Sequence, residues 1–70
     1  MKEDYDAFTD NLNRYMGSMS NSELSRLSGV GKTAIFKYRN RQSNPTLFSA
    51  LRIAKALDIP LSYLTEGMVE

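Results

Sequence analysis

Apolar residues recur along the chain at the three- and four-residue spacing that places them on one face of an α-helix. Tyr5, Phe8, Leu12 and Tyr15 follow this spacing, which predicts a first amphipathic helix over residues 4–16. Strictly alternating apolar and polar runs, which indicate half-buried strands, do not occur in the sequence. The pattern therefore predicts an all-α fold.

A second, shorter helix is predicted over residues 21–28. Ser20 and Glu23 form an S-x-x-E capping box, in which the serine hydroxyl accepts a hydrogen bond from the backbone N–H of the glutamate. Leu24 and Leu27 lie about one turn apart on this helix. We expect both leucines to face the core.

The segment between the second and third predicted helices is too short for two antiparallel helices to lie side by side. Gly29 suits the left-handed end of a helix, and Gly31 begins the third helix over residues 32–39. Ile35 and Tyr38 are its inward pair. A turn of this length is typical of a helix-turn-helix unit, whose helices cross at a steep angle.

Two more helices are predicted toward the end of the chain. Asn44 is the expected N-cap of a helix over residues 45–57, because Pro45 suits its first position. A short fifth helix over residues 61–66 follows. The apolar stripe of the fourth helix has a four-three-three spacing: Leu47, Leu51, Ala54 and Leu57. The prediction is a single domain, a compact five-helix orthogonal bundle that contains a helix-turn-helix.

Charge is segregated along the sequence, although the formal net charge is only +1. Of nine lysines and arginines, all but Lys2 and Arg14 lie within residues 24–57, and none of the eight acids does. Segregation of this kind builds one positive and one negative face and favours a polyanionic partner. The alternative is a mixed solvated surface on which the charges happen to cluster.

The residue inventory excludes several classes of function. The chain has no cysteine and no histidine, so disulfides, zinc sites and catalytic triads that use either residue are excluded. No apolar run approaches the length of a membrane span, which is about 18 residues or more, and the acidic first ten residues are unlike a signal peptide. We expect no enzyme activity, no metal or other cofactor, no evident small-molecule effector, and a cytoplasmic location.

Residues 24–35, Leu-Ser-Arg-Leu-Ser-Gly-Val-Gly-Lys-Thr-Ala-Ile, resemble the helix-turn-helix of the lambda repressor and Cro family. The likeness continues through Asn-Pro-Thr at 44–46 and Leu-Arg-Ile-Ala-Lys-Ala-Leu at 51–57 to Ile-Pro-Leu-Ser-Tyr-Leu at 59–64. Each element alone is weak evidence for the resemblance, whereas the combined spacing of all of them is specific to this family. The resemblance implies a sequence-specific transcriptional regulator in the bacterial cytoplasm or nucleoid. Its expected form is a phage or bacterial repressor, either Cro-like or the N-terminal domain of a longer repressor.

In this family the start of the third helix enters the major groove of double-stranded DNA. Lysine can donate to guanine acceptors, and threonine or phenylalanine can touch a thymine methyl group. The resemblance implies base contacts from Lys32, Thr33, Phe36 and Lys37. Two alternatives stay open: the lysines contact only phosphates, or Phe36 packs under the loop before the fourth helix.

Phosphate contacts are expected from helix N-termini and from short polar or basic side chains. Asn21 stands where the family usually has a glutamine with this role. The expected set is Asn21, Arg26, Arg39, Arg41, Gln42, Ser43 and Asn44. Each is alternatively a solvated surface residue, and the Asn44 side chain alternatively serves only as a cap.

The sequence departs from the family pattern after the third helix. Arg39 and Arg41 stand where the family often has an acid and a glycine. We expect Arg39 to turn to DNA or to bind an acid such as Asp10, and Asn40 to take the left-handed conformation that the glycine would supply.

One short recognition helix reads only a few base pairs, so we expect a homodimer on a palindromic operator. The candidate dimer contacts lie near the end of the chain: Ile59, Leu61, Tyr63, Met68 and Val69. A protein-interaction module that keeps the same bundle is the alternative, and the acidic first helix is the feature that supports it. An antitoxin or restriction-controller regulator is a variant of the main hypothesis.

Overall fold

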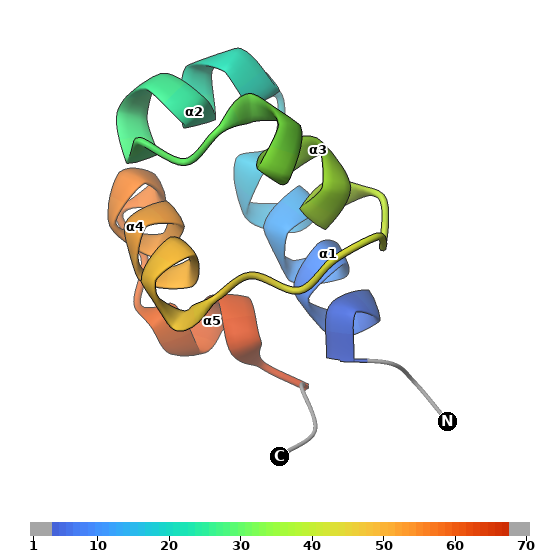
Figure 1. Ribbon diagram of the computed structural model, residues 1–70. Helices are drawn as coiled ribbons and strands as arrows, with labels where there is room; N and C mark the ends of the chain where they lie inside the picture. The colour runs from blue at the N-terminus through green and yellow to red at the C-terminus, as the bar shows by residue number, and fades with distance from the viewer. Residues whose placement is uncertain (1–3, 68–70) are drawn as a thin grey trace.

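Five α-helices form the secondary structure of residues 4–67, the part of the chain that the computed structural model describes. They are α1 (Asp4–Met16), α2 (Asn21–Ser28), α3 (Lys32–Arg39), α4 (Leu47–Leu57) and α5 (Leu61–Thr65). Helix α1 packs against α3 and α5, α2 packs against α3 and α4, and α4 packs against α5 (Figure 1). The prediction of an all-α bundle with a helix-turn-helix is confirmed. No helix within residues 4–67 is long and apolar enough to cross a membrane.

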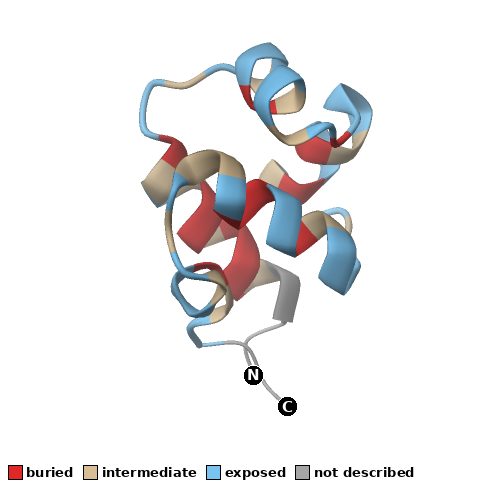
Figure 2. Cartoon of the chain, turned by 90° about the vertical axis from the view of Figure 1, so that its left-hand side faces the viewer, coloured by how far each residue is buried: buried red, intermediate tan, exposed pale blue. Residues whose placement is uncertain are grey.

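The core lies where the inner faces of the helices meet, and the outer faces are exposed (Figure 2). Its largest fully buried apolar side chains come from all five helices: Phe8, Leu12, Leu24, Ile35, Ile53 and Leu64. The ring of Phe8 meets that of Tyr38 edge to face, with centroids 5.9 Å apart, and so joins α1 to α3. Burial of this set from every helix is what gives so short a chain a core.

Helix α2 is capped at both ends as the sequence predicts, and its C-cap begins the turn of the helix-turn-helix. The Ser20 hydroxyl accepts a hydrogen bond from the Glu23 N–H at 3.1 Å, and Gly29 takes the left-handed conformation with φ of 77°. Val30, in the turn, is buried with Leu24 and Ile35. The small apolar cluster of these three side chains fixes the crossing angle of α2 and α3.

Two polar side chains of α1 are buried and hold the ends of other helices. The Thr9 hydroxyl donates to the backbone carbonyl of Tyr38 near the end of α3. The Asn11 amide donates to the carbonyls of Leu64 and Glu66 at the end of α5, each at 2.8 Å. Because these carbonyls lack partners within their own helices, the bonds complete both C-termini.

The predicted start of α4 was wrong by two residues. Thr46, not Asn44, is the N-cap, and its hydroxyl accepts a hydrogen bond from the Ser49 N–H at 3.2 Å. Pro45 therefore precedes the helix instead of occupying its first position. A threonine N-cap, whose hydroxyl accepts from the backbone N–H three residues later, satisfies a helix start as well as an Asn-Pro start does. The sequence was therefore compatible with either helix start. Helix α5 ends at Thr65, one residue before the predicted end.

Three leucines predicted to face the core lie at the surface. Leu27 in α2 is 47% exposed, and in α4 Leu47 is 69% and Leu51 is 45% exposed. The buried residues of α4 are Ala50, Ile53 and Ala54. Helix α4 carries two overlapping apolar stripes that share Ala54. The stripe with Ala50 and Ile53 faces inward, because the small side chains of Ala50 and Ala54 let α4 approach α2 and α5 closely.

The left-handed residue after α3 is Arg41, and the expectation that Asn40 would take this role was wrong. Arg41 has φ of 59°, whereas Asn40 has φ of −118° and donates its side-chain N–H to the Phe36 carbonyl at 2.7 Å. The Arg41 guanidinium reaches α1, where Nε lies 2.9 Å from Asp6 and Nη2 lies 2.7 Å from Asp10. Two carboxylates thus hold a side chain whose backbone is unfavourable for any residue with a Cβ.

Replacing Arg41 by glycine is therefore expected to yield a more stable protein than replacing it by alanine. Both variants lose the exposed ion pairs, which are worth less than about 1 kcal/mol each. Only alanine keeps the strained Cβ, which costs about 1 kcal/mol in a left-handed residue. Urea unfolding of the two variants measures the difference directly, and equal stabilities would show that residue 41 is not left-handed in solution.

Candidate nucleic-acid interface

The outer face of α3 is exposed and carries the four residues predicted to contact bases: Lys32, Thr33, Phe36 and Lys37. These residues lie on one side of the helix, since the last three follow Lys32 by one, four and five positions. The opposite side carries Ile35 and Tyr38, which are buried and anchor the helix. Phe36 is 51% exposed, so about half of its surface is open to a partner. The arrangement presents all four side chains together.

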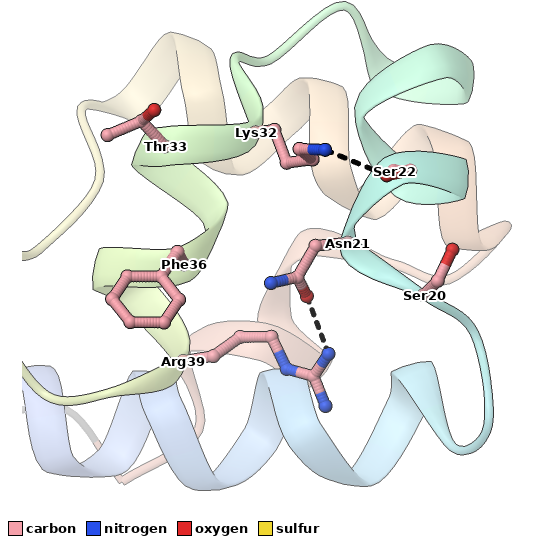
Figure 3. A pocket seen from close by; sticks show the side chains of 7 residues that line it. All are labelled: Ser20, Asn21, Ser22, Lys32, Thr33, Phe36 and Arg39. Carbon is pink, nitrogen blue, oxygen red and sulfur yellow. Dashed lines mark hydrogen bonds between the residues drawn. The ribbon is translucent and has the colours of Figure 1, made fainter.

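A hollow of about 550 Å³ lies between the outer face of α3 and the start of α2 (Figure 3). Its lining comes from both helices and the N-cap of α2: Ser20, Asn21, Ser22, Lys32, Thr33, Phe36 and Arg39. None of these seven side chains is a carboxylate, and two are cations. The backbone N–H groups at the start of α2 add partial positive charge. The hollow is therefore suited to an anion.

Lys32 joins the two sides of the hollow. Its ammonium group donates a hydrogen bond to the Ser22 hydroxyl at 3.2 Å, from the first residue of α3 to the second residue of α2 (Figure 3). Both side chains are exposed, so the bond orients the lysine without burying its charge. The lysine remains available to an acceptor that approaches from solvent.

Arg39 is partly buried and bonds to neutral amides, so the expectation that it would bind an acid such as Asp10 was wrong. Its Nε donates to Asn13 Oδ1 of α1, and its Nη1 donates to Asn21 Oδ1 of α2, both at 2.6 Å. Asp10 accepts from Arg41 instead. Arg39 therefore connects three helices at the edge of the hollow. Asn13 was not among the predicted site residues, because nothing local in the sequence of α1 marks it.

The other predicted phosphate-contacting residues lie outside the lining of the hollow. Arg26 is exposed on α2, and Gln42 and Asn44 are exposed in the loop between α3 and α4. Ser43 is partly buried and donates to the Asn44 carbonyl at 3.3 Å. Arg41 binds Asp6 and Asp10 of α1. Ser20 and Ser22 line the hollow but were missed as site residues, although their place at the start of α2 was a usable signal.

The candidate dimer residues differ in their surroundings. Ile59 and Leu61 are partly buried against the core, whereas Tyr63 is 48% exposed and stacks on Tyr15 with ring centroids 5.8 Å apart. Met68 and Val69 lie outside the described residues. A second hollow of about 580 Å³ between α4 and α5 includes Leu51, Ile59 and Leu61 in its lining.

Comparison with known proteins gives two matches. A helix-turn-helix family model matches residues 16–64. Over 43 residues the chain is 40% identical to a protein of Methanocaldococcus jannaschii, MJ1164, whose name places it provisionally among HTH-type transcriptional regulatory proteins. The match covers 61% of this chain but only 14% of that relative, so the chain spans a small part of the relative's length. No solved structure matches the chain.

Proposed function

Because the chain belongs to the lambda repressor and Cro-like helix-turn-helix family, we propose that it is a transcription regulator that binds double-stranded DNA by placing α3 in the major groove. The single observation that carries the proposal is the outer face of α3. That face is exposed, holds Lys32, Thr33, Phe36 and Lys37, and belongs to a helix without an acid. Lysine ammonium groups donate to guanine O6 and N7, and the Thr33 and Phe36 side chains can contact thymine methyl groups.

The backbone of DNA meets the start of α2 in this arrangement. Asn21 and the first N–H groups of α2 donate to one phosphate group, since the hollow beside them is free of carboxylates in its lining. Arg26 and the loop residues Gln42, Ser43 and Asn44 provide further polar contacts to the backbone. We leave Arg41 out of this set, because Asp6 and Asp10 already neutralise its charge. The same ion pairs reduce the negative charge on α1, the feature that supported the alternative of a protein-interaction module.

We further propose that the protein is a repressor that binds a palindromic operator as a homodimer. An eight-residue helix reads only a few base pairs, so two copies are needed to specify an operator. The dimer contact proposed here is the corner of α4 and α5, with Ile59, Leu61 and the exposed ring of Tyr63. The apolar residues in the hollow at this corner support its use as a contact surface. Occlusion of the promoter is the simplest way in which such a compact dimer represses.

Selection of bound duplexes from a random pool is the experiment that tests this function. We expect a palindromic consensus with half-sites about 10 base pairs apart, centre to centre. Binding to that consensus should weaken steeply between 50 and 200 mM salt, by roughly a hundredfold or more, because phosphate contacts release counterions. Recovery of no preferred sequence, together with no binding at low salt, would contradict the proposal. A consensus without symmetry would contradict only the dimer.

A further inference from the structure

Arg39 carries a positive charge whose partners in residues 4–67 are the amide oxygens of Asn13 and Asn21, with no carboxylate among them. The side chain lines the 550 Å³ hollow and also a neighbouring hollow of about 380 Å³ that includes Asn13 and Asn21. A guanidinium has five N–H donors in a fixed plane, so bonds from Nε and Nη1 set its orientation. Arg39 is thus held in place by α1 and in turn holds a residue of α2.

The bond from Arg39 fixes which way the Asn21 amide faces. Because Asn21 Oδ1 accepts from the guanidinium, the Nδ2 group must point away from it. Figure 3 shows Nδ2 turned toward the space between α2 and α3, on the side of Phe36. An amide free to rotate would present its oxygen to that space as readily as its nitrogen, and an oxygen repels a phosphate. A charged donor on Oδ1 also polarises the amide and strengthens the donors on Nδ2.

We propose that Arg39 is a positioning residue for DNA binding, which acts by locking the Asn21 amide so that Nδ2 donates to a phosphate oxygen of the DNA backbone. The inference rests on the proposed function. It replaces the expectation of a direct phosphate contact from Arg39 with an action through Asn21. Asn13, which accepts from Arg39 Nε, keeps the guanidinium in the required plane.

A double-mutant cycle tests the coupling between the two residues. The unmodified chain, Asn21→Ala, Arg39→Met and the double variant are compared on one selected duplex at fixed salt. Asn21→Ala should weaken binding about tenfold, as expected for loss of a hydrogen bond to a charged group. Arg39→Met should weaken binding by about three- to fivefold, because the released amide can still donate to the phosphate but is no longer held in the donating orientation. The double variant should bind within about twofold of Asn21→Ala, since Arg39 acts through the contact that Asn21→Ala already removes.

The coupling separates positioning from the other roles of an arginine. A direct phosphate contact, or a purely structural role in joining α1 to α3, would weaken binding by the same factor whether residue 21 is asparagine or alanine. The inference would therefore be overturned if the double variant lost affinity by the product of the two single-variant factors. Should Arg39→Met fail to fold by circular dichroism, Arg39→Gln takes its place in the same cycle.

Asn21→Asp provides a second measurement on a variant expected to fold. Its carboxylate can pair with Arg39 but offers no donor to a phosphate, so binding should fall by more than the tenfold of Asn21→Ala. Binding as tight as that of the unmodified chain would overturn the inference. Failure of the unmodified chain to bind any duplex would instead remove the proposed function, and this inference with it. A chain that binds, but without coupling between residues 21 and 39, removes this inference alone.

Discussion

Replacing Lys32 by alanine is expected to change which DNA sequences the protein prefers. Lys32 is the first residue of α3, it is exposed, and its ammonium group is held beside the α2 N-terminus by Ser22. A lysine at this place in a helix-turn-helix meets base edges. We expect a loss of about 1–3 kcal/mol on the preferred duplex and a much smaller loss on unrelated duplexes. Fluorescence anisotropy titrations on both duplexes, at the same salt concentration, measure the ratio.

Arg26→Ala is the matched control for Lys32→Ala, because it also removes one exposed cation but lies on α2 outside the lining of the hollow. This variant should weaken binding to preferred and unrelated duplexes alike. An equal loss on all duplexes from Lys32→Ala would assign Lys32 to a phosphate and leave base reading to Thr33, Phe36 and Lys37. Either result for Lys32 distinguishes readout of bases from attraction to the backbone.

The parts of the fold that are set by neighbours in sequence could be predicted from the sequence. Three local signals set where α2 begins and ends and where α3 begins: the Ser20 cap, the left-handed Gly29 and the short turn between the two helices. Each of them acts within a few residues. The exposed face of α3 follows in the same way from the inward Ile35 and Tyr38. These local signals already place the four candidate base-reading residues on one surface.

The parts that depend on how helices dock could not be predicted in the same way. The choice between the two stripes of α4 depends on how closely alanines let it approach α2 and α5. Arg39 reaches Asn13 and Asn21 over 26 and 18 positions, and Arg41 reaches Asp10 over 31. Charge rules favoured an acid for Arg39, and the geometry gives that acid to Arg41 instead. Pairings of this kind follow from the position of α1, which no local pattern encodes.

Helix α1 therefore organises the helix-turn-helix although it carries none of the predicted contact residues. Through Thr9 it caps the end of α3, and through Asn13 it orients the guanidinium beside Asn21. Through Asp6 and Asp10 it holds Arg41, two residues after the end of α3. A change in the packing of α1 should consequently affect DNA binding through the position of α3.

Phe8→Ala is expected to have the largest effect on stability of any change discussed above. Phe8 is fully buried, and its ring packs edge to face on Tyr38, which lies on the inner side of α3. Truncation of a buried phenylalanine costs about 3–5 kcal/mol, through lost burial and the cavity that remains. A small domain has a total free energy of unfolding of only about 5–15 kcal/mol, and a chain of this length belongs at the lower end. Much of the variant should therefore be unfolded at 37 °C.

Phe36→Ala is the matched control for Phe8→Ala, because it removes the same side chain from the exposed outer face of α3. Its free energy of unfolding should change by less than about 1 kcal/mol, while its affinity for the selected duplex should fall. Urea unfolding followed by circular dichroism, with a binding titration well below the midpoint, gives both quantities for each variant. If Phe8→Ala unfolded at the same urea concentration as the unmodified chain, the packing of α1 on α3 would not be what holds the reading helix. If Phe36→Ala lost as much free energy of unfolding as is expected for Phe8→Ala, the outer face of α3 would be part of the core and unavailable to DNA.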